Sequence, residues 1–406
     1  MNIAIIGAGA SGMAAALQAA WHEAPVTLFE SNASVGRKLL VTGSGRCNLS
    51  NDAVNAAKYS CGDAGWMAQL LNRFGVGDLT EMLEKIGIPT IRTDDGWLYP
   101  LSGSAHSVVE AFSSALQLSG VNLSLDSRVS SIEAADGKFT IHTVQGGKNR
   151  EGVFERVILS AGGVAYPTLG SRGELFPVLQ QLGHTLIPQR PALAPVLADL
   201  GPYKALLGVR LDAGTALWRG SKKIASAVGN LIFTEWGLNG PAVMNLSHAI
   251  PANPAGVDLS LDLLAFFQPA FERLLVVNRD GQMPLRILLD GFFAPKVVQL
   301  ILKINRLDMD IRLGEMDDSA IKTVVNGIRN IRLAVKGVRG FEYCQVSAGG
   351  VPVSEVDPLT LESKLVKGLY LTGETLDVVG PCGGYNLHYA FASGVLAGRA
   401  AAGLHG

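Results

Sequence analysis

NIAIIGAGASG, residues 2–12, is the stretch that decides the fold of this 406-residue chain. An apolar strand over 2–6 runs into a G-x-G-x-x-G turn, and the small residues of a buried helix follow it. A second apolar strand over 26–29 ends on Glu30, eighteen residues after Gly12. This succession of strand, glycine turn, helix, strand and acid predicts a βαβ unit that binds a dinucleotide.

Each position of the motif has its own physical role. We expect Gly7 to permit the tight turn, Gly9 to let the backbone approach a pyrophosphate, and Gly12 to let the helix pack closely. The N–H groups at the start of the helix favour an anion, and Glu30 is expected to bind a ribose hydroxyl. The alternative is a glycine-rich turn that only opens a buried helix.

The composition is that of an α/β enzyme with a large core. Hydrophobic residues make up 48% and charged residues 17% of a chain that is long enough for two or three domains. The formal net charge of −1 gives no global attraction for nucleic acid or an anionic membrane. Residues 1–22 are apolar, but they lack a cationic start and contain the glycine turn, which argues against a signal peptide or a membrane span. We therefore expect a cytoplasmic protein.

The cysteines indicate neither a metal site nor a redox pair. The chain has four of them, and none stands in a C-x-x-C spacing. A reduced compartment is the simplest interpretation, and we expect no bound metal.

The order of the predicted elements indicates a nucleotide domain that is interrupted in sequence. Three prolines between 188 and 195 mark a crossing between domains. Strands over 157–159 and 368–372 each end in a glycine turn, and a closing helix over 387–402 follows the second of them. We predict a nucleotide-binding domain of 1–190 with 346–406, an inserted β-rich, barrel-like domain of 191–262 with 328–345, and a small helical domain of 263–327.

The distribution of glycine turns favours FAD over NAD as the resident cofactor. The chain has one G-x-G-x-x-G motif, followed by a long loop over 31–48 that is typical of a functional segment. Arg37 and Lys38 lie in this loop, and Ala161-Gly162 and Gly373-Glu374 end distant strands. FAD is long enough to need contacts from such separate segments, so NAD(P)H is expected only as a transient electron donor.

Two long runs resemble a known family. GRKLLVTGSGRCN, residues 36–48, and GPCGGYNL, residues 380–387, are similar to the BaiN/YhiN-type flavoproteins, which are also described as NAD(P)/FAD-dependent oxidoreductases or aminoacetone-oxidase-like proteins. Shorter matches extend the resemblance over most of the chain, at 99–102, 233–241 and 348–351.

The resemblance implies an α/β fold in which a Rossmann-like, glutathione-reductase-type FAD domain is interrupted by a β-rich domain and a small helical one. Trp97 stands where the family has a basic residue and Glu235 where it has a histidine, so the family's substrates do not carry over directly. The motif and the resemblance together predict that noncovalent FAD is bound by Gly7, Gly9, Ala10, Ser11, Gly12, Glu30, Arg37, Lys38, Gly45, Arg46, Asn48, Val129, Ala161, Gly162, Gly373, Glu374, Asp377, Gly384, Asn386 and Leu387.

Three of these assignments have alternatives. Arg37 and Arg46 would each face either the FAD phosphates or an anionic substrate group, or would be solvated charges of the loop. Glu374 is expected to hydrogen-bond the ribityl chain of FAD, with Asp377 as the alternative acid. Trp97 and Tyr99, in the segment 94–100, either form an exposed aromatic loop that stacks on a flat substrate or belong to the core.

Four residues are candidates for the chemistry itself: Cys47, Tyr385, Asn386 and His388. The neighbouring Arg46 would lower the pKa of Cys47 and favour the thiolate, although a small buried side chain beside the flavin is the plainer interpretation. Asn386 is placed to cap the closing helix, whose N-terminus would stabilise negative charge on a reduced flavin. Tyr385 and His388 are candidate proton donors, but a single histidine on a helix is more often structural.

Several functions are compatible with these residues. The first is an FAD-dependent oxidoreductase that transfers hydride, from NAD(P)H, to a small unsaturated or carbonyl substrate. The alternatives are a flavin-dependent amine oxidase, a thiol redox protein centred on Cys47, and a flavoprotein that reduces an RNA base to dihydrouridine. The RNA alternative needs a basic face, for which Arg332, Lys336 and Arg339 are candidates, although these three could equally form a solvated sheet face.

Overall fold

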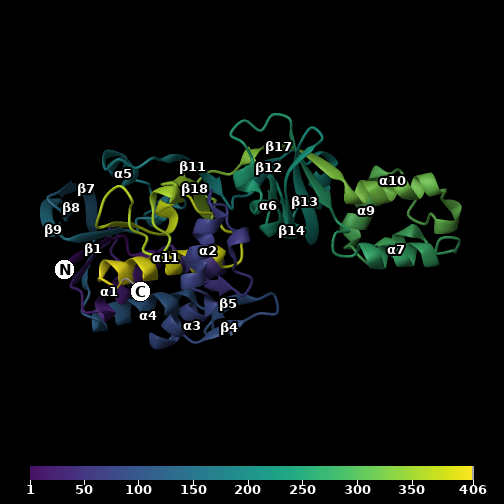
Figure 1. Cartoon of the computed structure of the whole chain (residues 1–406). Helices are drawn as coiled ribbons and strands as arrows, with labels where there is room; N and C mark the ends of the chain where they lie inside the picture. The colour runs from purple at the N-terminus through teal and green to yellow at the C-terminus, as the bar shows by residue number, and fades with distance from the viewer. Residues whose placement is uncertain (405–406) are drawn as a thin grey trace. The chain divides into compact units, whose positions relative to one another are not determined.

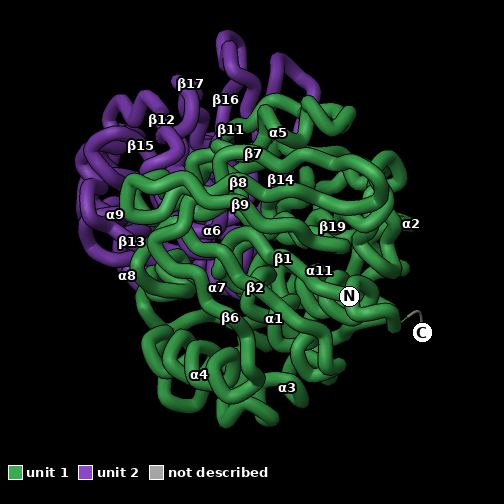
Figure 2. The backbone as a smooth tube through the Cα atoms, turned by 90° about the vertical axis from the view of Figure 1, so that its left-hand side faces the viewer, with its two compact units in different colours: residues 1–190, 344–406 green, residues 191–343 purple. Residues whose placement is uncertain are grey.

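The computed structural model describes residues 1–404, and the chain forms two compact units (Figure 2). The first unit contains residues 1–190 and the segment that begins at Cys344, and the second contains Pro191–Tyr343. These divisions lie close to the predicted boundaries at 190 and 346. Within residues 1–404, no helix is both long and apolar enough to cross a membrane.

A five-stranded parallel sheet forms the core of the first unit. Its strands, in spatial order, are β19 (Leu369–Leu371), β10 (Arg156–Leu159), β1 (Ile3–Ile6), β2 (Val26–Phe29) and β6 (Asn122–Ser124). Apolar residues dominate the inner strands because helices cover both faces of such a sheet. All five carboxyl ends therefore meet at one edge, where ligands of open α/β sheets bind.

Strand β6 belongs to the main sheet and not to the small sheet of the strands that follow it. It pairs with β2 in parallel register, because helix α4 (Ala105–Leu118) returns the chain to the edge of the main sheet. The antiparallel sheet is made of β7 (Ser127–Ala135), β8 (Lys138–Gln145) and β9 (Lys148–Phe154).

Helices α1 (Ala10–Trp21) and α11 (Tyr385–Ala401) lie side by side in the first unit, although they are the first and last helices described (Figure 1). A Cβ atom on Gly394 would lie 2.1 Å from the Ser11 carbonyl oxygen, and one on Gly398 would lie 2.4 Å from that of Ala15. The two backbones therefore touch, and this contact fixes the C-terminal segment against the helix of the glycine motif.

The first unit also carries a small sheet and further helices. The small sheet has the order β3 (Ser50–Asn51), β5 (Trp97–Pro100) and β4 (Thr90–Arg92). The remaining elements are α2 (Ala64–Arg73), α3 (Val76–Lys85), α5 (Phe176–Gln181), β11 (Ile187–Ala192), which crosses the unit boundary, and β18 (Val346–Gly350).

The second unit is a closed barrel with a helical insertion. The barrel strands are β12 (Val196–Ala198), β15 (Gly237–Asn239), β14 (Lys222–Thr234), β13 (Arg210–Arg219), β16 (Val257–Asp262) and β17 (Ile331–Val338). Along β17, buried Ile331, Leu333 and Val335 alternate with exposed residues, as a barrel wall requires. The helices of this unit are α6 (Pro241–Met244), α7 (Gln268–Val277), α8 (Leu285–Asp290), α9 (Pro295–Ile304) and α10 (Asp318–Arg329).

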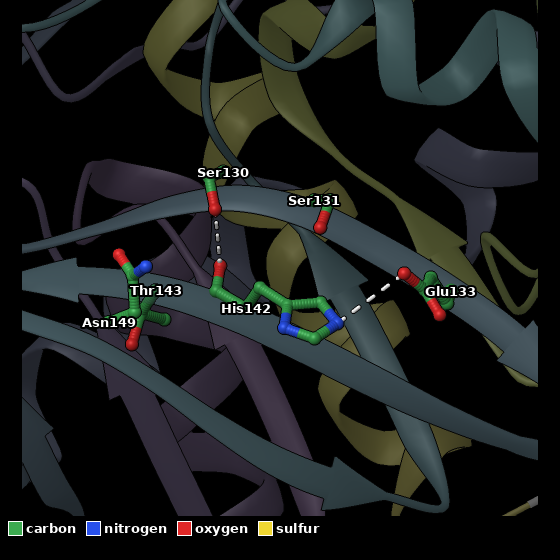
Figure 3. A pocket seen from close by; sticks show the side chains of 6 residues that line it. All are labelled: Ser130, Ser131, Glu133, His142, Thr143 and Asn149. Carbon is green, nitrogen blue, oxygen red and sulfur yellow. Dashed lines mark hydrogen bonds and ion pairs between the residues drawn. The ribbon is translucent and has the colours of Figure 1, made fainter.

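A shallow recess lies on the antiparallel sheet of the first unit (Figure 3). In it, the His142 Nε2 atom lies 3.4 Å from a Glu133 carboxylate oxygen, and Ser130 donates a hydrogen bond to the His142 carbonyl. The lining residues are Ser130, Ser131, Glu133, His142, Thr143 and Asn149. None of the residues predicted to bind FAD is among them, so this recess is separate from the predicted site.

Candidate functional site

The glycine turn between β1 and α1 has the geometry that the motif predicts. Gly7 has a φ of +98°, and a Cβ atom there would lie 2.5 Å from the Ser160 carbonyl oxygen. A Cβ atom on Gly12 would lie 1.8 Å from the carbonyl oxygen of Gly7, which confirms its packing role. A Cβ atom on Gly9, by contrast, would meet no heavy atom within 4 Å beyond its chain neighbours, and no side chain caps α1. The turn therefore fits the close approach of a pyrophosphate.

Glu30 at the end of β2 is held by two backbone groups. Its Oε2 atom accepts a hydrogen bond from the Ala8 N–H at 2.9 Å, and its Oε1 atom accepts from the Asn32 N–H at 2.9 Å. Arg37 donates in turn to the side-chain oxygen of Asn32. Asn32 was not among the predicted residues, because its role depends on contacts with Glu30 and Arg37 that form only in the folded chain. These bonds connect Arg37 to the glycine turn.

The carboxyl ends of the other central strands complete this edge of the sheet. Ser160 after β10 and Thr372 after β19 share a hydrogen bond of 2.6 Å between their hydroxyl groups. A Cβ atom on Gly373 would lie 2.9 Å from the Ser11 hydroxyl. The structure thus brings the segments 160–162 and 372–373 to the glycine motif, as the prediction for Ala161, Gly162 and Gly373 requires.

Both candidate acids after β19 are bound to the segment of β18. Glu374 forms a half-buried ion pair with Lys38, and its Oε1 atom accepts from the Ser347 N–H at 3.0 Å. Asp377 accepts from the Gly349 N–H at 2.6 Å. Lys38 pairs with Glu374 and not with Asp377. This ion pair fixes the long loop after β2 against the C-terminal glycine turn.

The expectation that Asn386 caps the closing helix is wrong. Helix α11 begins at Tyr385, and Gly384, with a φ of +95°, occupies the cap position. The Asn386 side chain instead accepts from the Gly380 N–H at 2.8 Å and donates to the Gly380 carbonyl at 2.9 Å. It therefore fixes the loop 380–384 directly before the helix.

Gly384 packs against the backbone of β3. A Cβ atom on Gly384 would lie 2.3 Å from the Ser50 carbonyl oxygen. The buried Asn48 amide is oriented to donate to that carbonyl and to the carbonyl of Leu98. Asn48 thus supports the start of α11 through the small sheet.

The expectation of a low pKa for Cys47 is also wrong. The Cys47 side chain is completely buried, and burial raises the pKa of its thiol to about 11. Arg46 is the next residue, but its guanidinium lies over the Tyr99 ring, 4.3 Å from the ring centroid. Burial therefore outweighs the neighbouring charge, and Cys47 fits a packing role.

We expect Cys47 to be unreactive in the folded protein. A thiol pKa of about 11, against an ordinary value of 9.0, lowers the thiolate fraction at neutral pH about 100-fold. Iodoacetamide labelling of Cys47 at pH 7, followed by peptide mass spectrometry, should be far slower in the folded than in the urea-unfolded chain. Rapid labelling of the folded protein, or loss of turnover in Cys47→Ser, would restore the thiol hypothesis.

His388 does not have the environment of a proton donor at neutral pH. It is completely buried, its Nδ1 atom lies 2.9 Å from the Ser50 hydroxyl, and its ring lies beside Phe74. Burial lowers the pKa of His388 to about 4, so the imidazole is neutral at pH 7. Tyr385 is buried against Tyr59, and burial raises the pKa of its phenol, so it keeps its proton and stays a candidate donor.

His388 should make the stability of the protein dependent on pH. An unfolded histidine has a pKa near 6.5, so the unfolded chain binds a proton before the folded one does. The stability of the fold that depends on a neutral His388 is therefore fully present above about pH 6.5. It is lost as the pH falls towards 4. Thermal unfolding between pH 7 and 5 should show a smaller loss of Tm in His388→Asn than in wild type. The exposed control His106→Asn should keep the wild-type slope.

The remaining predicted residues lie at the edges of this region. Gly45 and Arg46 are exposed, and Leu387 is half-buried on α11. Val129 is buried on β7, which directly follows β6. Trp97 and Tyr99 belong to β5 rather than to an exposed loop, and Tyr99 is only 5% exposed.

The three basic residues of the second unit have different surroundings. Arg332 is exposed and stacks on Trp218 at 4.5 Å. Lys336 lies 3.4 Å from an Asp199 carboxylate oxygen. Arg339 packs between two aromatic rings, 4.8 Å from that of Trp236 and 3.2 Å from that of Tyr343. Of the three, Arg332 fits best a residue that contacts a phosphate.

Several curated proteins resemble almost the whole chain. A 3-dehydro-bile acid delta(4,6)-reductase of Clostridium scindens is 34% identical over 410 residues, which cover 99% of both chains. A ribosomal RNA dihydrouridine synthase of Haemophilus influenzae is 28% identical over 391 residues, which cover 96% of this chain and 95% of the relative.

Solved structures show the same fold. A 3-ketosteroid-delta4-(5alpha)-dehydrogenase from Rhodococcus jostii matches with a TM-score of 0.51 at 16% identity, covering 99% of this chain and 96% of its own. A 3-ketosteroid delta1-dehydrogenase from Sterolibacterium denitrificans matches with a TM-score of 0.55 at 12% identity, covering 98% of this chain and 99% of its own. Sequence and fold together identify an FAD-dependent oxidoreductase with a Rossmann-like nucleotide domain. The chain belongs to the HI0933-like protein Rossmann domain family, whose model matches residues 1–400.

Proposed function

We propose that this protein binds FAD noncovalently and uses NAD(P)H to reduce a small substrate with a conjugated or carbonyl double bond. The 34% identity to a bile acid reductase over the whole chain supports reduction over amine oxidation. The observation that carries the proposal is the glycine turn, in which Gly7 and Gly12 are sterically required while the space around Gly9 is open. A cytoplasmic location stays a prediction.

The residues that would hold FAD form a continuous series in the first unit. The N–H groups of the glycine turn would bind the pyrophosphate, and Glu30 would bind the ribose. Arg37 adds a positive charge at the Glu30 end, while the Lys38–Glu374 pair lies at the C-terminal glycine turn. When bound, FAD supplies hydride transfer.

The chain itself would supply orientation, electrostatics and a proton. The loop 380–384 is fixed by Asn386, and the N-terminus of α11 that follows it favours negative charge. Tyr385, on the first turn of this helix, keeps its phenolic proton at neutral pH because burial raises its pKa. Tyr385 is therefore our candidate proton donor.

A visible spectrum before and after anaerobic addition of NADH, and then of NADPH, tests this function. The purified protein should show an oxidised flavin spectrum that one of the two nucleotides bleaches. A flavin that stays oxidised with both would contradict NAD(P)H as donor and favour an amine oxidase. Absence of flavin after reconstitution with FAD would contradict the proposal as a whole.

Reduction of an RNA base is the second candidate. It is favoured by the similarity to ribosomal RNA dihydrouridine synthases and by the exposed Arg332–Trp218 stack, which combines a cation with an aromatic surface. Charge reversal in Arg332→Glu should abolish RNA retention without changing the flavin spectrum. Lys336→Glu should have less effect because Asp199 already neutralises Lys336. RNA binding that survives Arg332→Glu would argue against this function.

A further inference from the structure

Helix α7 lies at the edge of the helical part of the second unit (Figure 1). Phe271 is its only buried residue, and the ring centroids of Phe271 and Phe292 are 5.3 Å apart. Near the end of the helix, by contrast, Val276 and Val277 are 74% and 75% exposed, and Leu274 is 40% exposed. Neighbouring apolar side chains that are exposed and surrounded by polar residues mark an interaction surface.

The two valines lie between one cation and one anion on the same face of the helix. Residues three, four and seven positions apart share a helix face, so this outer stripe consists of Arg273, Val276, Val277 and Asp280. Asp280 lies in the turn that continues α7, where the Arg279 N–H still bonds to the Val276 carbonyl at 3.3 Å. Arg273 and Asp280 are both exposed, and neither forms an ion pair within residues 1–404.

This stripe is complementary to a second copy of itself. If two copies of α7 lie antiparallel with a two-fold axis between Val276 and Val277, the valines of one copy meet those of the other. Arg273 and Asp280 are equally far from this axis in sequence, so each Arg273 then lies opposite Asp280 of the other copy. One arrangement therefore buries the apolar centre and gives both unpaired charges a partner. A two-fold contact of this kind is closed and ends at the dimer.

The charges around the stripe argue against a membrane or a strongly charged partner. A helix that lies on a membrane surface is rich in Lys and Arg on its polar face, whereas here Glu272 and Asp280 outnumber Arg273. Arg279 is already bound to Asp318 at 2.9 Å. The chain as a whole has a formal net charge of −1, so two copies do not repel each other at long range.

We propose that the outer face of α7 is the interface of a homodimer, in which Val276 and Val277 form the apolar centre and Arg273 pairs with Asp280 of the second copy. A standard interface buries about 800 Å² on each partner, and a helix of ten residues is only about 15 Å long. The contact is therefore small, and the dimer dissociates in the micromolar range. This inference goes beyond the flavin function and does not depend on it.

Sedimentation equilibrium of the purified full-length protein, at concentrations from about 1 to 200 µM, tests this interface. The weight-average mass should rise with concentration from that of one chain towards that of two. Val277→Asp should raise the dissociation constant about tenfold or more, because it brings two carboxylates together beside the two-fold axis. Leu118→Asp is the matched control, because Leu118 ends α4 in the first unit, is 89% exposed and should not affect association.

A charge exchange tests the pairing across the axis. Arg273→Glu should weaken association about tenfold, because two carboxylates would then face each other at each end of the contact. Asp280→Lys should weaken it similarly by opposing two cations. The double variant Arg273→Glu with Asp280→Lys restores opposite charges and should recover the wild-type dissociation constant. Circular dichroism of each variant should match wild type, because these side chains lie outside the core.

Three results would contradict the proposal. A wild-type protein that stays monomeric over the whole concentration range, or a dimer that Val277→Asp leaves intact, would overturn the interface. A double variant that associates no better than Arg273→Glu alone would refute the antiparallel pairing. A monomeric protein that binds phosphatidylglycerol vesicles, and loses this binding in Val277→Asp, would assign the face to a membrane instead.

Discussion

Gly12→Ala should prevent stable folding of the first unit. The added Cβ atom would lie 1.8 Å from the Gly7 carbonyl oxygen, and neither the turn nor α1 has a flexible side chain that could move away. Overpacking of a core costs about 1–3 kcal/mol of stability. We expect a clash between a Cβ atom and a backbone oxygen to cost at least the upper value. Thermal unfolding of the FAD-free protein, followed by circular dichroism, should show a large loss of Tm or no cooperative transition.

Gly9→Ala is the matched control, because the same methyl group meets no heavy atom within 4 Å there. The FAD-free variant should unfold like wild type, while its affinity for FAD falls about tenfold or more, since the methyl group occupies the space left for the pyrophosphate. Equal stability losses in the two variants would show that the open space around Gly9 has no relation to a ligand.

Glu30→Gln should weaken FAD binding about tenfold to a hundredfold. Both carboxylate oxygens accept backbone N–H groups, from Ala8 and from Asn32. Glutamine offers one oxygen and one NH2 group, so one of these N–H groups would face another donor and the glycine turn would shift. Hydrogen bonds to a charged acceptor contribute about 1.5–3 kcal/mol, which corresponds to the expected loss of affinity.

Equilibrium titration of the FAD-free protein with FAD, followed by quenching of flavin fluorescence, measures this effect. Glu23→Gln provides the control, because Glu23 is an exposed acid just after α1 and makes no contact with the glycine turn. Unchanged FAD affinity in Glu30→Gln would remove Glu30 from the cofactor site.

The nucleotide domain of this protein could be predicted from the sequence alone. The roles of Gly7 and Gly12 follow from short-range sterics, which depend on residues a few positions apart and on one neighbouring strand. The strands β1, β2, β10 and β19 could also be predicted, because buried parallel strands have nearly continuous runs of apolar residues. The glycine turns at 162 and 373 also indicated that distant segments return to one site.

The protonation states of His388 and Cys47 could not be predicted from the sequence. Burial lowers the pKa of His388, which lies beside Ser50, 338 positions away, and Phe74, and the imidazole is therefore neutral at pH 7. Burial raises the pKa of the Cys47 thiol to about 11 although Arg46 is the next residue. Burial and hydrogen-bond partners are properties of the packed segments and not of sequence neighbours.

The partners of the cations in the loop 36–48 likewise follow from the fold and not from the sequence. The sequence places Arg37, Lys38 and Arg46 in one loop and does not tell which of them meets the cofactor and which meets a substrate. The fold separates them, because Asn32, Glu374 and Tyr99 come from different parts of the chain and each fixes one cation. The sequence therefore determined that a flavin-type nucleotide domain forms, whereas the long-range contacts of the tertiary structure decided which of its charges remain available to a ligand.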